Sequence, residues 1–234
     1  MGQDAEMSIT TVGLDADDTL WHSEDGFRAT ELAFYELLAP FAPTGIDIKA
    51  ALTATERANL HTYGYGVKAF GLSMVEAAIT ISQGQVPTEV LAHLIQLTRD
   101  LLLAPVRLLD SVPEVLQELA KSHRLVLITK GDLVHQTRKV TTSGLDHLFE
   151  HVEIVLEKDV ATYAKVLRDI SVQPEKVCMV GNSVKSDILP ILELGGHAVH
   201  IPYHFLWELE QAEHPPLSPR FGELRNINEL PAWI

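Results

Sequence analysis

The chain has 234 residues, of which 46% are hydrophobic, and its net charge is -14. This length and apolar content are sufficient for one large globular domain or for a core with an insertion. The excess of 32 Asp and Glu over 18 Lys and Arg disfavours nucleic acid and anionic membrane surfaces as partners.

The first ten residues, MGQDAEMSIT, predict no targeting signal. They lack the basic start and the apolar core of a secretory signal, and Glu6 stands where a myristoylation motif has Ser or Thr. No stretch reaches the roughly 18 apolar residues of a membrane span. The single cysteine, Cys178, cannot form an internal disulfide. We therefore expect a protein of the reducing cytoplasm, as a monomer or a homodimer.

Residues 9–14, ITTVGL, predict a buried strand that runs into the acidic sequence DADD. Because residues i and i+2 of an extended chain point the same way, Asp15 and Asp17 are expected to face one pocket while Asp18 faces elsewhere. Two neighbouring carboxylates suit a hard divalent cation such as Mg²⁺, and they could also divide the work of nucleophile and proton donor. From this run alone, an acidic turn without catalytic function is an equal alternative.

Residues 22–105 predict an inserted helical domain, because the next convincing strand begins only at residue 124 and the stretch between is apolar and mostly helical. Phe27 and Phe34 are examples of its apolar residues at helical spacing. Inside it, residues 59–70 predict a turn between two helices. The alternative is a specificity loop in which Lys68 contacts an anionic substrate.

The remaining residues predict strands that alternate with helices. Strands are expected over residues 124–129, 152–156, 176–181 and 197–201, and helices over 111–122, 132–144, 159–170 and 183–195. Strands apolar enough to be covered on both faces indicate an α/β fold with a doubly wound, mostly parallel sheet. We expect a discontinuous Rossmann-like core, residues 1–21 and 106–234, beside a small all-helical cap domain.

Local signals add detail to the core. Ser111 and Glu114 form a capping-box pattern at a helix start, and Pro190 predicts a kink in the last long helix. The Pro-broken C-terminal tail, residues 213–234, is expected to wrap the core, with Leu230 and Trp233 as anchors.

The predicted strands of the core end beside residues that carry chemistry. The second strand ends at Thr129, followed by Lys130 and Gly131; Lys158 follows the third strand and Asp187 follows the fourth. Ligands of open α/β sheets bind at the carboxyl ends of the strands, so these side chains are expected near the acidic pair. Lys130 either binds substrate or faces solvent, and Gly131 allows the loop its conformation.

These elements together resemble the haloacid dehalogenase superfamily, with a helical cap inserted after the first strand. The sequence DADDT resembles the first motif of that family, the T of LITKG the second, the K of LEKD the third and GNSVKSD the fourth. The order and the strand context match across essentially the whole chain, whereas the insertion and the tail match only in placement. Four elements in register are far more specific than a lone DxDxT.

The resemblance implies a Mg²⁺-dependent phosphomonoester hydrolase that acts on a small soluble phosphorylated metabolite. Asp15 would attack phosphorus and form an aspartyl-phosphate, and Asp17 would protonate the leaving alcohol and then activate water. Thr129 would bind a phosphoryl oxygen, and Lys158 would offset negative charge. The Asp15 carboxylate, the Asp17 carbonyl and Asp187 would hold Mg²⁺.

Two residues refine this interpretation. Asp17 favours a phosphatase over a dehalogenase, because an alkoxide leaving group needs a proton and a halide does not. Asn182 replaces the first acid of the fourth motif, so it is assigned to the second shell of the metal and predicts weaker Mg²⁺ binding. A phosphomutase and a non-catalytic binding protein of the same fold remain alternatives. The sequence leaves the identity of the substrate open.

Lys165 and three histidines are weaker candidates for functional roles. Lys165 is a rival for the position of Lys158, but its sequence context is typical of a helix face. His197, His200 and His204 do not predict a zinc site, because no cysteine or glutamate completes a recognisable ligand spacing.

Overall fold

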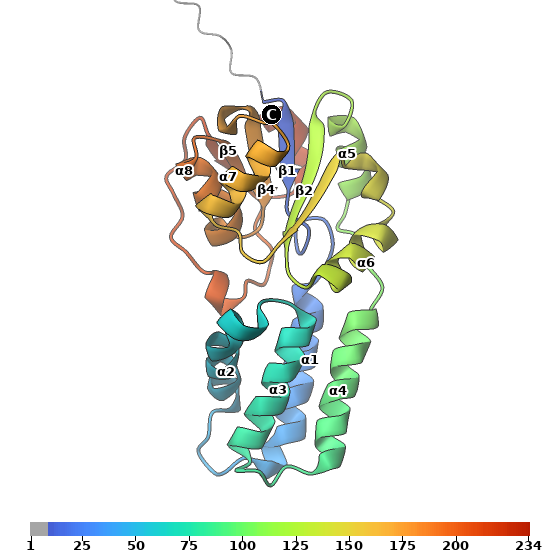
Figure 1. Ribbon diagram of the computed structural model, residues 1–234, viewed down its shortest axis with the longest axis vertical. Coiled ribbons are helices and arrows are strands. Elements are labelled where there is room, and N and C mark those ends of the chain that lie inside the picture. The colour runs from blue at the N-terminus through green and yellow to red at the C-terminus, as the bar shows by residue number, and fades with distance from the viewer. Residues whose placement is uncertain (1–8) are drawn as a thin grey trace, which may run out of the picture. The chain divides into compact units, whose positions relative to one another are not determined.

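The computed structural model describes residues 9–234, so most of the N-terminal segment searched for targeting signals lies outside the described residues. The chain divides into two compact units (Figure 1). The helical unit is Ser23–Pro105, and the core unit consists of the chain up to His22 together with Val106–Ile234. The first boundary lies one residue beyond the expected position.

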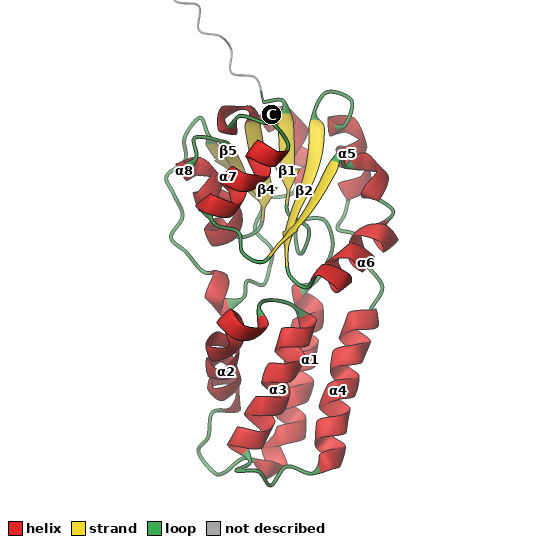
Figure 2. Ribbon diagram, viewed as in Figure 1, coloured by secondary structure: helices red, strands yellow, loops and turns green. Residues whose placement is uncertain are grey.

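The described part of the core unit is built on a six-stranded parallel sheet (Figure 2). Its strands are β1 (Thr11–Leu14), β2 (Arg124–Lys130), β3 (His151–Val155), β4 (Val177–Gly181), β5 (His197–His200) and β6 (Phe221–Glu223). The spatial order β3-β2-β1-β4-β5-β6 is that of a doubly wound Rossmann-like sheet and confirms the predicted fold class. The sequence did not predict β6, because its run of three residues forms a strand only by pairing with β5.

Helices cover both faces of this sheet. One face packs against α5 (Val112–Leu119), α6 (Leu133–Ser143) and α9 (Leu230–Trp233), and the other packs against α7 (Val160–Asp169) and α8 (Leu189–Glu193). Successive residues of β2 alternate between the two layers, with Leu127 in the cluster of α5 and Ile128 in the cluster of α7. This two-residue alternation of fully apolar side chains explains why the strands read as continuous hydrophobic runs.

The helical unit contains α1 (Glu24–Leu38), α2 (Ile48–Tyr63), α3 (Val67–Ile81) and α4 (Thr88–Leu103). Phe34, Met74 and Leu94 are fully buried in its own apolar core. Gly64 and Gly66 have φ values of 70° and 107° and connect α2 to α3, so the turn between helices that the sequence favoured within residues 59–70 lies at residues 64–66. Among the described residues, no helix is long and apolar enough to cross a membrane.

Three local expectations are tested by the structure. Ser111 does not cap α5, because its φ of 63° is left-handed, whereas a capping residue needs an extended backbone. Pro190 lies in the first turn of α8, after a π-helical turn over Val184–Ile188, so the expected single kinked helix is two elements. The tail does pack on the core: Leu230 is fully buried, and the Trp233 ring lies against Gly222.

Candidate active site

A buried ammonium group joins two buried carboxylates at the carboxyl ends of the strands. Lys158 Nζ lies 2.5 Å from Asp15 Oδ1 and 2.7 Å from Asp187 Oδ1. The three residues are 4%, 7% and 1% exposed, respectively. The fold thus brings together three of the residues that the sequence predicted. The rival Lys165 is exposed on α7 and pairs with Asp169.

The electrostatics of this group favour an additional cation. Burial raises the pKa of Asp15 to about 7; the charge of Lys158 opposes that rise and the charge of Asp187 adds to it. Burial alone would lower the pKa of Lys158, but the two carboxylates keep it well above its usual value. Two buried carboxylates against one ammonium leave an excess of negative charge, and oxygen ligands of this type fit Mg²⁺.

The loop after β4 positions Asp187. The backbone N–H of Ser183 donates to Asp187 Oδ2 at 3.0 Å, across the start of the π-helical turn. A Cβ atom on Gly181 would lie 2.2 Å from the same oxygen, so the carboxylate packs where only glycine leaves room. Such π-helical turns are rare and occur frequently at functional sites.

The Asp17 carboxylate has donors on several sides. Lys139 Nζ lies 2.5 Å and 2.7 Å from its two oxygens, Gln136 Nε2 donates at 3.1 Å, and Trp21 Nε1 donates at 2.6 Å. Burial would raise the pKa of Asp17, but Lys139 and these hydrogen bonds lower it below its usual value. The sequence reasoning missed Gln136 and Lys139. Their signal was present, since they stand three residues apart on the helix after Thr129.

Two threonines complete this region of the site. Thr129 is buried, and Gln136 Nε2 donates to its Oγ1 at 2.8 Å, which leaves the Thr129 hydroxyl as a donor. Thr19 was not predicted, although it is the last residue of DADDT, and its hydroxyl donates to Asp15 Oδ2 at 3.0 Å. Gly131 has a φ of 143°, which agrees with the expected freedom of its loop.

Lys130 belongs to an ion-pair cluster that links the end of β2 to the segment between β5 and β6. Its Nζ lies 2.7 Å from Glu210 Oε1, 3.1 Å from Glu157 Oε1 and 3.1 Å from Ser186 Oγ. Glu210 also accepts a hydrogen bond from Ser183 at 2.7 Å. The sequence offered no signal for Glu210, which lies in the irregular segment between β5 and β6. A contact between Lys130 and substrate stays a prediction.

Asn182 and Lys68 were the remaining candidates. Asn182 is half-buried after β4, where its Oδ1 lies 3.5 Å from the hydroxyl oxygen of Thr19. Its position beside Thr19, which contacts Asp15, is compatible with an outer metal shell. Lys68 is exposed in the first turn of α3 in the helical unit, and its contact with substrate stays a prediction.

Comparison with known proteins establishes the family. A family model described as haloacid dehalogenase-like hydrolase matches residues 9–195, so the chain belongs to this family and is a hydrolase. A haloacid dehalogenase-like family hydrolase from Xanthomonas campestris has a similar crystal structure, with 36% identity, a TM-score of 0.86, and coverage of 99% of this chain and 93% of that chain. A 2-haloacid dehalogenase from Pseudomonas syringae shares the fold at 22% identity, with a TM-score of 0.63 over 96% of this chain and 97% of that chain.

Curated relatives carry phosphatase names. The glyceraldehyde 3-phosphate phosphatase of Methanothermobacter thermautotrophicus is 32% identical over 116 residues, which are 47% of this chain and 50% of that protein. The protein of the same name from Pyrococcus furiosus is 33% identical over 89 residues, which are 36% of this chain and 37% of that protein. The matches therefore span half or less of the length of these relatives.

Proposed function

We propose that this protein is a Mg²⁺-dependent phosphomonoester hydrolase that acts on a small phosphorylated metabolite. The observation that carries the proposal is the buried group Asp15–Lys158–Asp187 with a second acid, Asp17, two residues after the first. A site with a nucleophilic carboxylate, a fixed cation and a separate proton donor matches what phosphoryl transfer requires. The phosphatase names of the curated relatives support the same reaction.

Each residue of the site has a task in this reaction. Asp15 attacks phosphorus through a carboxylate oxygen, and the bond from phosphorus to the ester oxygen breaks as an aspartyl-phosphate forms. Lys158 offsets the negative charge of Asp15 and the phosphate, and Thr129 donates a hydrogen bond to a phosphoryl oxygen. Asp17 gives its proton to the leaving alkoxide and then takes one from the water that cleaves the aspartyl-phosphate.

The oxygens of Asp15 and Asp187, with the backbone carbonyl of Asp17, would hold Mg²⁺. When bound, the ion supplies positive charge that stabilises the transferring phosphoryl group. Its binding also relieves the repulsion between two carboxylates that Lys158 alone only partly compensates.

The contact between Lys139 and Asp17 adds a condition to the mechanism. Because Lys139 keeps Asp17 ionised, Asp17 becomes a proton donor only when the ammonium turns to another anion. We infer that the phosphate of the substrate is this anion. Binding of substrate then raises the pKa of Asp17, which takes up a proton from water before it gives one to the leaving alkoxide.

The test is phosphate release from an aryl phosphate, glyceraldehyde 3-phosphate and a panel of other metabolite phosphates, with Mg²⁺ or with a chelator. We expect release that depends on Mg²⁺ and falls by at least about a thousandfold in Asp15→Asn, because removal of a catalytic nucleophile leaves little of the rate. The matched control is Asp169→Asn, an exposed aspartate on α7 that should leave the rate unchanged.

Three outcomes distinguish the proposal from its alternatives. Equal rates with Asp15→Asn and the wild type would show that Asp15 is not the nucleophile. Isomerisation of sugar phosphates without net phosphate release would indicate a phosphomutase. Mg²⁺ binding without any turnover of the panel would favour a binding protein.

A further inference from the structure

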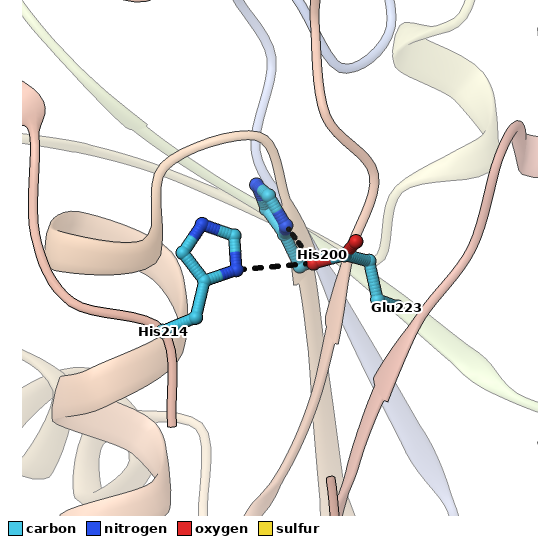
Figure 3. A group of neighbouring side chains, drawn as sticks. All are labelled: His200, His214 and Glu223. Carbon is cyan, nitrogen blue, oxygen red and sulfur yellow. Dashed lines mark hydrogen bonds and ion pairs between the residues drawn. The ribbon is translucent and has the colours of Figure 1, made fainter. Parts of the chain in front are cut away.

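Three potential metal ligands meet at β5 and β6, the edge of the core sheet opposite β3. His200 ends β5, Glu223 ends β6, and His214 comes from the loop before β6 (Figure 3). The nitrogen and oxygen atoms that these residues offer all lie within 4.8 Å of one another. We propose that His200, His214 and Glu223 bind a divalent transition-metal ion, of which Zn²⁺ is the best match, at a site separate from the acidic one.

The fold holds two of the ligands in place before any ion binds. His200 and Glu223 are paired in the register of the neighbouring parallel strands β5 and β6. Their side chains therefore project from the same face of the sheet, and His200 Nδ1 lies 3.1 Å from Glu223 Oε2. His214 Nδ1 lies 3.1 Å from the same oxygen. The ligand atoms of a tetrahedral zinc ion are separated from one another by about 3.3 Å. Small shifts of these side chains would therefore suffice to place a zinc ion among them.

The hydrogen bonds of His200 argue for a cation at this point. His200 Nε2 lies 3.0 Å from the backbone carbonyl oxygen of Asn182, which can only accept, so Nε2 carries a proton. The opposite nitrogen, Nδ1, faces a carboxylate oxygen of Glu223, which is also an acceptor. Their lone pairs repel unless a positive group lies between them. A second proton on the His200 ring would make this contact a hydrogen bond, whereas a metal ion would bind the Nδ1 atoms of both histidines and the carboxylate together.

The same bond to Asn182 is the support that metal-binding histidines usually have. A histidine ligand commonly donates its other ring N–H to a carbonyl or a carboxylate, which fixes the ring and its tautomer. His200 is only 5% exposed at its side chain, so its ring is further held by packing. The arrangement leaves Nδ1 as the ligand atom.

An ion can reach the site from solvent. The side chains of His214 and Glu223 are 54% and 43% exposed, and the three residues line a pocket of about 350 Å³. Among the described residues that line this pocket, none is Lys or Arg, so no side-chain ammonium or guanidinium lining it competes for Glu223. Two imidazoles and one carboxylate favour Zn²⁺ over Mg²⁺, and water can supply the fourth ligand.

The test is calorimetric titration of tag-free protein with Zn²⁺ in the presence of a large excess of Mg²⁺, which keeps Zn²⁺ from the acidic site. We expect one Zn²⁺ per chain. His214→Ala and Glu223→Gln should weaken binding by at least about tenfold, since even the loss of an outer partner of a metal ligand costs that much. His214 is the first choice because its side chain is exposed, and circular dichroism checks that the variant folds.

The control is His147→Ala, which removes an exposed histidine elsewhere in the core unit and should bind like the wild type. A second background, Asp187→Asn, removes the acidic site without touching the three ligands and should retain Zn²⁺ binding. The proposal is overturned if no Zn²⁺ binds, if His214→Ala binds as tightly as the wild type, or if Asp187→Asn abolishes binding. Anomalous scattering at the zinc edge of a crystal should show the ion among His200, His214 and Glu223, and an ion bound elsewhere also overturns the proposal.

Discussion

Lys158 shows how much of the site depends on single side chains. Its ammonium is almost completely buried and contacts two carboxylates that would otherwise repel each other. Removal of one partner from a buried ion pair costs more than the pair contributes, because an uncompensated charge stays behind. Lys165, seven residues later, has the same chemistry on an exposed helix face, where its ion pair contributes little.

Replacement of Lys158 by methionine keeps most of the length of the side chain and removes its charge. In metal-free protein at pH 8 we expect Lys158→Met to lower the free energy of unfolding by about 3 kcal/mol. The loss should be smaller at pH 5, because Asp15, with a pKa near 7, is then protonated. Urea unfolding measures both values. Lys165→Met is the control, with a change of less than about 0.5 kcal/mol; equal stability of the two variants would contradict this assignment.

Asn182 is the residue at which this chain departs from the motif it resembles. Asn182→Asp places a carboxylate near Asp15 and Asp187, so Mg²⁺ should bind several-fold to about tenfold more tightly. A tenfold change in affinity corresponds to about 1.4 kcal/mol of binding free energy. Titration calorimetry with Mg²⁺ measures the change. Asn228→Asp adds the same charge at an exposed position in the tail and serves as the control. If both variants bind Mg²⁺ equally, the amide of Asn182 does not limit affinity.

At the scale of elements, burial of a polar group on a helix can oppose the stability of that helix. Glu56 lies on α2 in the helical unit, and its Oε2 is buried without a hydrogen-bond partner. Burial, and then the charges of Glu31 and Glu24, raise the pKa of Glu56 to about 8. The folded unit therefore retains a proton that the unfolded chain has lost above its pKa of 4.5.

This difference predicts how stability depends on pH. Because the folded state binds more protons, the free energy of unfolding should fall as the pH rises from about 4.5 to about 8 and then level off. Glu56→Gln should remove the contribution of Glu56 to this fall and be more stable than the wild type by at least about 1 kcal/mol at pH 8, with little difference at pH 4. The contribution of Asp15, whose pKa is raised to about 7, should remain in the variant. Chemical denaturation across this range measures the effect. The exposed Glu36→Gln is the control, and a fall of unchanged size in Glu56→Gln would contradict the assignment to Glu56.

At the scale of the whole molecule, the core unit closes around the point where the helical unit is inserted. The backbone N–H of His22 donates to the carbonyl of Arg107 at 2.9 Å, and that of Leu109 donates to Leu20 at 2.9 Å. An antiparallel bridge between Trp21 and Leu108 lies between these bonds. The chain therefore leaves and rejoins the core at adjacent positions, as expected where domain insertion is tolerated.

This closure predicts that the core unit folds without residues 23–105. A linker of about four Gly and Ser residues between His22 and Val106 should give a protein with the same parallel sheet. Circular dichroism and dispersed amide signals in nuclear magnetic resonance measure the fold. A linker of the same length inserted between Val180 and Gly181, which interrupts buried β4, is expected to prevent folding. If the shortened core does not fold, folding of the core unit depends on the helical unit.

The local sequence determined the features that depend on spacing along the chain. The alternation of strands and helices predicted the doubly wound core, and residues placed at strand ends, Asp15, Thr129, Lys158 and Asp187, were identified because parallel strands bring such ends to one edge. The expected cap at Ser111 was wrong, because a left-handed backbone overrides the side-chain pattern.

Tertiary structure alone decided which distant side chains meet. The ion pair of Lys139 with Asp17, that of Lys130 with Glu210, and the cluster of His200 with His214 and Glu223 join segments that no periodic pattern relates. Two of these three groups of contacts include residues of the irregular segment that follows β5. The short strand β6 in this segment is set by pairing with β5 and not by its own propensity. The sequence by itself therefore determined five strands of the sheet, the inserted helices and the residues Asp15, Lys158 and Asp187 of the acidic site. The contacts that tune the charge of that site, and the second cluster of ligands, arise only when the folded chain brings remote residues within hydrogen-bonding distance.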